Sequence, residues 1–228
     1  MKISVIIPAY NEEQNIVRTV ESVEKRAGQF VEEVIVVDGG SKDETVRQAK
    51  KTSATVISSP QKGRAAQMNY GAAKAKAELL YFLHADTIPP ELFDKKIVDA
   101  AVNGYKAGCF RLSFDSEHFL LKFYAWCTRF DIDAFRFGDQ SLFVQSELFN
   151  SINGFKEDHI VMEDQEIIKR LKKQSSFKVL KESVTTSSRK YNKNGVIKLQ
   201  LIFTLIFMLY KAGVSQSKLV LIYKKLIH

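Results

Sequence analysis

Three short acidic segments, each placed directly after an apolar run, carry most of the chemical information in this chain. They are VVDGGS with Asp38, YFLHADT with Asp86, and VMEDQE with Glu163 and Asp164. The carboxyl ends of strands in an open parallel sheet face one crevice, so Asp38 and Asp86 should point into the same space. Carboxylates gathered in a cleft repel one another unless a cation or a hydrogen-bonding ligand joins them. A divalent metal carrying phosphate oxygens meets that need, which indicates phosphate chemistry.

Two glycine-containing segments could bring the backbone close to a ligand. Gly39 and Gly40 follow Asp38, whose free carboxylate oxygens would suit a nucleobase N–H or a ribose hydroxyl; an ordinary turn is the alternative. In GRAAQMNYG, the guanidinium of Arg64 stands at an expected helix start and could clamp a diphosphate. The chain has neither a GxGxxG fingerprint nor a GxxxxGK[ST] loop, which disfavours dinucleotide redox chemistry and P-loop hydrolysis.

Two further positions have a functional and a structural interpretation. PAYNEE turns the chain after the first strand, where backbone amides and a helix start could receive an anionic or nucleotide ligand. The alternative is a simple turn, with Asn11 as the expected cap of the next helix. His84 lies two residues before Asp86 and is a candidate ligand, although a lone histidine is more often packed or hydrogen-bonded.

Strands and helices alternate along the first half of the chain. Apolar runs bounded by turn residues predict strands at 2–7, 33–38, 55–59 and 79–84, and helices after Asn11, near 43–51 and at about 63–77. Further on, the pattern predicts a helix near 91–102, a strand at 107–114, a helical stretch at 117–130 and a strand within 139–146. This βαβ order implies an α/β fold with a mostly parallel sheet and right-handed crossovers.

The segment after residue 195 differs from the rest, because it consists of two apolar helical stretches split at Gly213. Its uncharged run from Leu199 to Tyr210 is shorter than the roughly 20 residues that a spanning helix needs, so we expect no membrane crossing. One alternative docks both helices on the domain as core cover or as a homodimer contact. The other lays them on an anionic membrane surface, where each nearby lysine would contribute about 1 kcal/mol.

Composition limits the classes of protein to consider. A chain of 228 residues with 45% hydrophobic and 26% charged residues is ordinary for one globular domain. Cys109 and Cys127 lack CxxC spacing, and no signal-peptide pattern follows Met1, so we expect a reduced, cytoplasmic location without zinc or disulfides. The net charge of +8 comes without RNA-binding signatures, which disfavours a nucleic-acid partner and leaves a membrane surface or anionic substrates.

The order of these motifs resembles that of the family 2 glycosyltransferases, inverting enzymes with a GT-A fold, over nearly the whole chain. PAYNEE and VVDGGSKDET resemble the nucleotide-binding start of the family, LHADT its DxD metal motif, and Glu163–Asp164 its ED motif with the catalytic base. The segments LHADT, RFGDQSLFV, GFKEDHIVMEDQE and GVSQSKLVLIYKK resemble a compact bacterial branch named for arsenosugar biosynthesis and for association with radical-SAM proteins.

The resemblance implies a GT-A domain over 1–195, with a nucleotide-sugar-binding half at 1–90, an acceptor-side half at 91–195 and a helical tail at 196–228. It also implies a donor site, with Arg64 on the phosphates or ribose and Asp86 on a Mg²⁺ or Mn²⁺ ion and the diphosphate. The other implied donor residues are Pro8, Ala9, Tyr10, Glu12 and Asp38. His84 stands where DxD would place a carboxylate, and the QxxRW motif of processive synthases is absent, which favours single transfers.

The chemistry that fits is one displacement, in which an acceptor hydroxyl attacks the anomeric carbon of a nucleoside-diphosphate sugar. Asp164 would take the acceptor proton and Glu163 would orient it or the acceptor; the alternative is that acids simply favour a helix start. Asp139 and Gln140 could hydrogen-bond sugar or acceptor hydroxyls, and Arg189 could reach the diphosphate, the alternatives being a turn and an exposed charge.

Two other functions compete with sugar transfer. A nucleotidyltransferase is the alternative enzyme, but it needs a glycine- and basic-rich triphosphate signature, which the first strand lacks. A non-catalytic sugar-nucleotide-binding protein is the third possibility, and the presence of Asp38, Asp86 and Asp164 together argues against it.

Overall fold

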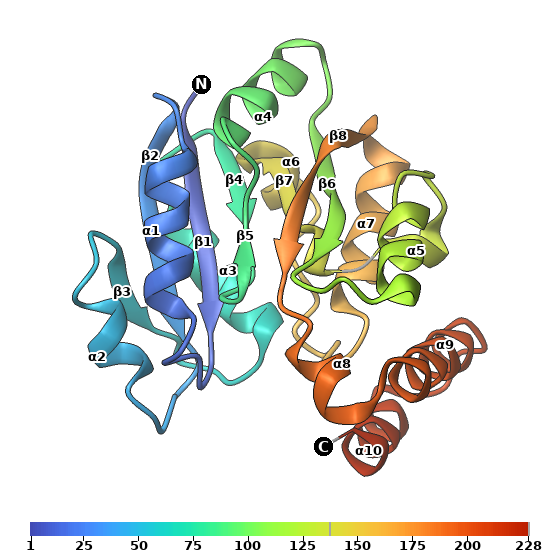
Figure 1. Ribbon diagram of the computed structural model, residues 1–228. Helices are drawn as coiled ribbons and strands as arrows, with labels where there is room; N and C mark the ends of the chain where they lie inside the picture. Colours follow the sequence, from blue (N-terminus) through green and yellow to red (C-terminus); the bar gives the residue numbers. More distant parts are fainter. Residues whose placement is uncertain (137, 228) are drawn as a thin grey trace.

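One mixed β-sheet forms the centre of the molecule, with helices on both faces (Figure 1). The structure, a computed structural model, describes residues 1–136 and 138–227. Over these residues the sheet has eight strands in the order β3-β2-β1-β4-β7-β6-β8-β5. The strands are β1 (Ile3–Ala9), β2 (Val31–Asp38), β3 (Thr55–Ser58), β4 (Leu79–Phe82), β5 (Thr87–Ile88), β6 (Ala107–Phe114), β7 (Leu142–Gln145) and β8 (Phe177–Thr186).

Strands β3, β2, β1 and β4 form a parallel part of the sheet, and antiparallel pairs occur at β7 and at β5. Strands β3, β2, β1 and β4 all run in one direction, which confirms the expected βαβ order. Strand β7 is antiparallel to both β4 and β6, β6 and β8 are parallel, and the short β5 pairs antiparallel with β8. The predicted α/β class with a mostly parallel sheet is therefore confirmed.

Ten α-helices are found in the described parts of the chain. They are α1 (Ile16–Arg26), α2 (Thr45–Ala49), α3 (Arg64–Lys74), α4 (Phe93–Val102), α5 (Phe119–Cys127), α6 (Ser146–Ser151), α7 (Glu163–Gln174), α8 (Arg189–Asn194), α9 (Val196–Lys211) and α10 (Gln216–Leu226). Two 3₁₀ turns, η1 (Asp133–Phe135) and η2 (Gly138–Gln140), precede β7.

The two faces of the sheet bury separate hydrophobic cores. Alternate residues of β1 point to opposite sides: Val5 and Ile7 pack with α1 and α4, whereas Ile6 packs with α3, α6 and α7. A central strand covered on both faces is mostly apolar, and every residue of β1 is buried, including the polar Ser4. This double layer fixes the strand ends, from which the polar loops project.

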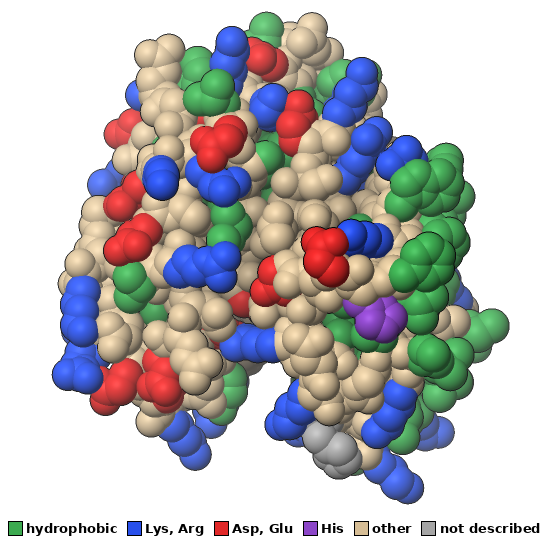
Figure 2. All heavy atoms as spheres, in the orientation of Figure 1, with side chains coloured by type: hydrophobic (Ala, Val, Ile, Leu, Met, Phe, Trp, Pro, Cys, Tyr) green, Lys and Arg blue, Asp and Glu red, His purple; other side chains and the backbone are tan. Residues whose placement is uncertain are grey.

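The register brings the polar strand ends to one edge. Ala9 at the end of β1 pairs with Asp38 at the end of β2, and Asp38 pairs with Ser58 of β3. On the other side of β1, Ile6 pairs with Phe82, so His84 and Asp86 follow within four residues of that strand end. Figure 2 shows the molecule hollowed between this edge and the C-terminal helices.

The C-terminal helices pack on the domain through one face only. Leu199, Ile202 and Ile206 of α9 and Leu219 of α10 are buried, whereas Ile197 and Leu201 on the outer side of α9 are exposed. No helix in residues 1–136 and 138–227 has the length and apolar character needed to cross a membrane. The expected split of the tail at Gly213 is confirmed, because α9 ends at Lys211 and α10 begins at Gln216.

One local prediction is wrong and two strands were not predicted. Asn11 does not cap α1: it has a left-handed φ of 54° and its side-chain oxygen accepts a hydrogen bond from the Lys42 amide, while the helix begins at Ile16. Strands β5 and β8 were not foreseen, because β5 has only two residues and β8 is half-exposed along most of its length.

Candidate active site

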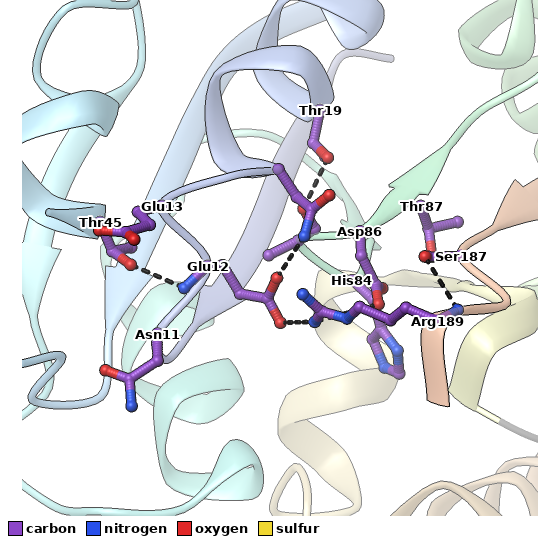
Figure 3. Close-up of polar contacts among 12 residues, drawn as sticks. Asn11, Glu12, Glu13, Thr19, Thr45, His84, Asp86, Thr87, Ser187 and Arg189 are labelled. Carbon is purple, nitrogen blue, oxygen red and sulfur yellow. Dashed lines mark hydrogen bonds and ion pairs between the residues drawn. The ribbon is translucent and has the colours of Figure 1, made fainter. Parts of the chain in front are cut away.

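The side chains singled out from the sequence converge at the carboxyl ends of β1, β2 and β4, opposite the starts of α3, α7 and α8. Glu12 follows β1, His84 and Asp86 follow β4, and Arg189 opens α8. Figure 3 shows Glu12, Asp86, His84 and Arg189 pointing toward one another across this space. The site is therefore assembled from segments that are up to 177 residues apart in the chain.

An ion pair joins the start of α3 to the start of α7. Arg64 Nε lies 2.7 Å from Glu163 Oε1, and the Glu163 side chain is only 2% exposed. Burial raises the pKa of Glu163 to about 6; Arg64 opposes this shift and the neighbouring Asp164 adds to it. Burial alone would lower the pKa of Arg64, but the carboxylates of Glu163, Asp164 and Asp139 outweigh it and raise that pKa.

His84 connects the same arginine to Asp139. Arg64 Nη1 lies 3.2 Å from His84 Nε2, and His84 Nδ1 lies 3.0 Å from Asp139 Oδ1. A guanidinium can only donate, so Nε2 must accept and the ring proton lies on Nδ1, from which it is donated to Asp139. Burial would raise the pKa of Asp139, but this hydrogen bond and the nearby cations lower it below its ordinary value. Both ring nitrogens of His84 are thus engaged by protein.

A second guanidinium lies between two carboxylates on the other side of the site (Figure 3). Arg189 forms an ion pair with Glu12, and its Nη2 lies 3.4 Å from Asp86 Oδ2. Glu12 is held in turn by Asn15, whose amide donates to Glu12 Oε2 at 2.8 Å. Burial, followed by the charges of Asp139 and Glu12, raises the pKa of Asp86, while His84 and Arg189 act in the opposite direction.

Asp164 differs from its neighbour Glu163 in lying against backbone. A Cβ atom added at Gly138 would lie 2.0 Å from Asp164 Oδ2, so the carboxylate rests directly on this glycine. No side chain or amide of the described residues donates a hydrogen bond to it. Met162, which precedes α7, has a left-handed φ of 66°, a conformation that costs a non-glycine residue about 1–2 kcal/mol. Such strain is concentrated at functional sites.

The expected free oxygens of Asp38 are not found. The carboxylate is buried and accepts hydrogen bonds from the backbone amides of Gly40, at 3.0 Å, and Ser41, at 3.2 Å, so it braces its own loop. Gln67, in the GRAAQMNYG segment, donates to the carbonyls of Ala9 and Val37 and holds the two strand ends together. Carboxylate lone pairs remain for a ligand, but the turn interpretation is the one that the geometry displays.

Other predicted residues lie at different depths. Pro8 and Ala9 are buried at the end of β1, so they can contribute backbone rather than side chains, and Tyr10 is exposed next to them. Gln140 is 1% exposed and its amide donates to the Phe110 carbonyl at 3.2 Å. The 3₁₀ turn η2 thus directs Asp139 toward the cavity and Gln140 into the protein, and a contact of Gln140 with sugar hydroxyls stays a prediction.

The carboxylates of the site fit a metal that arrives together with phosphate. Asp86 could supply one hard oxygen ligand, and a cation would relieve the negative charge of Asp139 and Glu12 around it. Within the described residues, no three His, Cys, Asp or Glu side chains form a ready metal-binding group. Mg²⁺ is commonly held by one or two carboxylates plus substrate phosphates, which matches this arrangement.

A single large cavity contains most of these groups. It has a volume of about 880 Å³ and is lined by Arg64, Asp86, Asp139, Glu163 and Asp164 at its polar end. Residues of α5, α9 and α10 also line it, together with residues of β6 and of the segment before α7, so the C-terminal helices take part in the site. This size lies within the range of pockets that enclose small-molecule ligands.

Comparison with known proteins identifies the family. The family model described as glycosyl transferase family 2 matches residues 4–154, more than half of the chain and nearly all of the segment that forms β1 to β7. The chain belongs to glycosyl transferase family 2. The family resemblance seen in the motifs is thereby confirmed.

The curated relatives of this family 2 glycosyl transferase match it over only part of their own length. The chain is 33% identical over 97 residues to glucosyl-3-phosphoglycerate synthase of Mycolicibacterium smegmatis, a match that covers 39% of this chain and 32% of that protein. It is 28% identical over 109 residues to dolichol-phosphate mannosyltransferase of Pyrococcus furiosus, covering 46% and 31%. The matches thus span about a third of the length of these curated relatives.

Solved structures establish the fold class of the family member. The mannosyltransferase PcManGT of Pyrobaculum calidifontis, in complex with GDP-Man and Mn²⁺, superposes with a TM-score of 0.71 at 17% identity, covering 92% of this chain and 64% of that one. Glucosyl-3-phosphoglycerate synthase of Mycobacterium tuberculosis, with Mn²⁺, UDP and glucosyl-3-phosphoglycerate, gives 0.64 at 18% identity, covering 93% and 80%. The fold is GT-A, a mixed α/β fold with a mostly parallel sheet.

Sequence reasoning missed two residues that shape this GT-A site. Gly138 sets the position of Asp164, and Gln67 ties β1 to β2. The glycine carries no signal of its own in the sequence, since its role depends on a contact with α7. Gln67 lies in a segment already noted for Arg64, and its three-residue spacing places it one helical turn further along α3.

Proposed function

We propose that this protein transfers a glycosyl group from a nucleoside-diphosphate sugar to an acceptor hydroxyl with inversion at the anomeric carbon. One observation carries the proposal: the Asp164 carboxylate lines the same cavity as the Arg64 guanidinium and Asp86. A base for the acceptor and charge for a leaving diphosphate thus face one space. Family membership supports the same chemistry.

The donor would lie along the ends of β1 and β2. The exposed Tyr10 and the backbone of the Gly39–Gly40 turn would face the nucleoside, together with Pro8 and Ala9, while Asp38 shapes that turn. Arg189, now paired with Glu12 and close to Asp86, would bind diphosphate oxygens, and Arg64 would approach them from α3. Asp139 would accept a hydrogen bond from a donor-sugar hydroxyl.

The chemical step is a single displacement. The acceptor oxygen forms a bond to the anomeric carbon while the bond from that carbon to the diphosphate oxygen breaks, and Asp164 takes the acceptor proton. General-base assistance of this kind contributes typically about 10²–10⁴-fold. The diphosphate departs with both bonding electrons, and the guanidinium groups of Arg64 and Arg189 stabilise the charge that develops.

A divalent metal is part of the proposal. Asp86 would hold it together with diphosphate oxygens, and when bound it would act as a Lewis acid that neutralises charge on the leaving group. The related structures with Mn²⁺ support a metal in the family. His84 is not proposed as a ligand, because Arg64 and Asp139 occupy its two nitrogens.

A donor screen tests the proposed function. Thermal unfolding is measured with UDP-, GDP-, CDP- and dTDP-sugars, each with and without Mg²⁺ or Mn²⁺. A donor at 100 times its Kd should stabilise the protein by about 2.7 kcal/mol. The stabilising donor is then incubated with the enzyme, and NMR of the released or transferred sugar determines the anomeric configuration. Retention of configuration, or no stabilisation by any donor, would contradict the proposal.

Three finer statements from the motifs remain predictions. The first is membership of the arsenosugar and radical-SAM branch. The second is the division into a domain at 1–195, with halves at 1–90 and 91–195, and a tail at 196–228. The third is a cytoplasmic location, with the tail either docked on the domain as cover or dimer contact, or lying on an anionic membrane. The shared cavity supports a close association of tail and domain, since α9 and α10 line it together with Asp164.

A further inference from the structure

The cavity that contains Asp164 changes character away from the catalytic carboxylates. All four acidic side chains that line it, Asp86, Asp139, Glu163 and Asp164, belong to the polar end described above. Beyond them, many of the lining side chains are aromatic or aliphatic, and those of α5, α9 and α10 form one part of this apolar wall. Members of this apolar wall are Phe123, Phe203, Ile206, Phe207, Met208 and Val220.

The apolar wall reaches the surface of the molecule. Leu201 and Met208 of α9 line the cavity, yet they are 65% and 64% exposed, and Phe123 of α5 is also exposed. Figure 2 shows apolar side chains gathered on the outer side of the region that holds α5. The lining of the cavity is therefore continuous with an exposed apolar surface, and a bound molecule could extend from Asp164 outward.

The charge of the wall also favours a particular kind of ligand. The charged residues that α8 and α10 contribute are Lys190 and Lys224, and no carboxylate of the described residues lines the outer part. A fully polar acceptor would leave this wall in contact with water. An apolar group placed there would gain about 25 cal/mol for each Å² of apolar surface removed from water.

We propose that the acceptor is an amphiphilic alcohol, whose hydroxyl meets Asp164 and whose apolar chain lies between α5, α9 and α10. This inference rests on the proposed function, because it names the acceptor class of the same site. It assigns a second role to the C-terminal helices, which select the acceptor in addition to covering the core.

A binding series with alkyl glucosides tests the apolar subsite without any knowledge of the donor. Methyl, hexyl, octyl and decyl β-D-glucoside are titrated below their critical micelle concentrations into the full-length protein. Emission from Trp126 reports binding, since this single tryptophan stacks on Phe123 with ring centroids 6.3 Å apart. Affinity should rise about fourfold for each buried methylene, the equivalent of about 0.8 kcal/mol, and calorimetry should give the same series.

Two double variants on α9 provide the matched comparison. Leu201→Gln with Met208→Gln changes the cavity wall, whereas Ile197→Gln with Leu205→Gln changes exposed residues of the same helix that do not line it, 62% and 43% exposed. The first pair should lose the dependence on chain length, and the second should keep it. A flat series in the unaltered protein, or equal losses in both pairs, would overturn the proposal.

The outcomes separate this inference from the proposed function and identify the source of the acceptor. Binding that grows with chain length while no nucleotide sugar binds would leave the subsite standing and remove sugar transfer. Transfer of the donor sugar to methyl and octyl glucoside at equal rates would support sugar transfer and remove the apolar subsite. A second arm measures binding of dodecyl glucoside presented in neutral phosphatidylcholine vesicles. If Leu201→Gln with Met208→Gln weakens binding only from the vesicles, the acceptor is a membrane lipid. If the same variant weakens binding of the dissolved monomers, the acceptor is a free amphiphile.

Discussion

Glu163 and Asp164 are neighbours in the chain, but their surroundings assign them different tasks. Glu163 is buried against Arg64, whereas Asp164 lines the cavity with its carboxylate on the backbone of Gly138. The Glu163 side chain is only 2% exposed and its Oε1 is occupied by Arg64 Nε at 2.7 Å, so an acceptor hydroxyl cannot readily reach it. Asp164 is therefore the better candidate for the base, and Glu163 for positioning Arg64.

The first prediction concerns Asp164→Asn. The amide keeps the shape of the side chain but cannot take the acceptor proton, so transfer should fall by at least about 100-fold. The affinity for the nucleoside diphosphate, measured by calorimetry, should stay near that of the unaltered protein. Asp158→Asn, at an exposed acid outside the cavity, is the control and should leave the rate unchanged. If Asp164→Asn keeps more than about a tenth of the rate, the base is another group.

Gly138→Ala is expected to disable the site by displacing the base. The new Cβ atom would lie 2.0 Å from Asp164 Oδ2, so the carboxylate must move, and misplacement by about 1 Å can cost about 100-fold in rate. Gly28→Ala is the control, because its Cβ would lie 3.3 Å from Asp94 and needs only a small adjustment. Steady-state rates and thermal unfolding of both variants are compared. An unimpaired Gly138→Ala enzyme would show that Asp164 is not held as described.

The buried Glu163 should also appear in the pH dependence of stability. Because burial raises its pKa from the ordinary 4.5 to about 6, the folded protein binds this proton more tightly than the unfolded chain. The contribution is thus fully present below pH 4.5 and is lost as the pH rises through about 6. Urea unfolding is measured for the unaltered protein and for Glu163→Gln across this pH range. As the pH rises, the free energy of unfolding of the unaltered protein should fall relative to that of the variant. Parallel curves for the two proteins would refute the raised pKa.

At the scale of elements, the turn after β4 carries two residues with different proposed tasks: Asp86 would bind the metal, and His84 positions Arg64 and Asp139. Asp86→Ala should remove the increase in diphosphate affinity that Mg²⁺ or Mn²⁺ provides, because the proposed hard oxygen ligand is lost. His84→Ala should keep that increase and lower affinity only modestly, since it breaks the link between Arg64 and Asp139. Titration with and without metal measures both. Equal metal dependence in the unaltered protein and Asp86→Ala would exclude the metal role.

The elements also show how far sequence patterns reach. The strand predicted at 107–114 coincides with β6, because most of this segment is apolar and its first four residues are buried. Strand β8 was missed, since most of its side chains are only partly buried and its sequence FKVLKESVTT contains several polar residues. The pairing of Arg189 with Glu12 depends on β8 and α8, so it could not follow from motifs read separately.

Site residues divide in the same way. Acids that follow apolar strands were located correctly, as Asp86 shows, because strand direction fixes where they emerge. Gln140 was assigned to the substrate by its place next to Asp139, yet η2 turns it inward to Phe110. Within a tight turn, the side chains of two successive residues can point in opposite directions. A short motif therefore does not reveal which of the two faces the cavity.

At the scale of the whole molecule, the net charge of +8 and the outer face of α9 bear on the membrane alternative. Ile197, Leu201, Leu205 and Met208 form an exposed stripe at three- and four-residue spacing, opposite the buried face of the same helix. The exposed Lys211, Lys218 and Lys225 lie on the same two helices or at their ends. Docking on the domain and adsorption to a surface are thus compatible, because they use opposite faces.

The last prediction is that the full-length protein floats with phosphatidylglycerol vesicles at low salt and is released at high salt, because exposed charges are screened within about 10 Å at 0.1 M ionic strength. Changing Lys211, Lys218 and Lys225 to glutamate should abolish flotation, since each lysine near an anionic surface contributes about 1 kcal/mol. The matched control changes Lys50, Lys51 and Lys74, which are exposed in the N-terminal half, by the same total charge. If the contact is local, the control variant should still float with the vesicles. If both triple variants lose flotation equally, the net charge alone is responsible. If the unaltered protein stays at the bottom of the gradient at low salt, the stripe on α9 serves the amphiphile or a second copy of the chain, and the acceptor comes from solution.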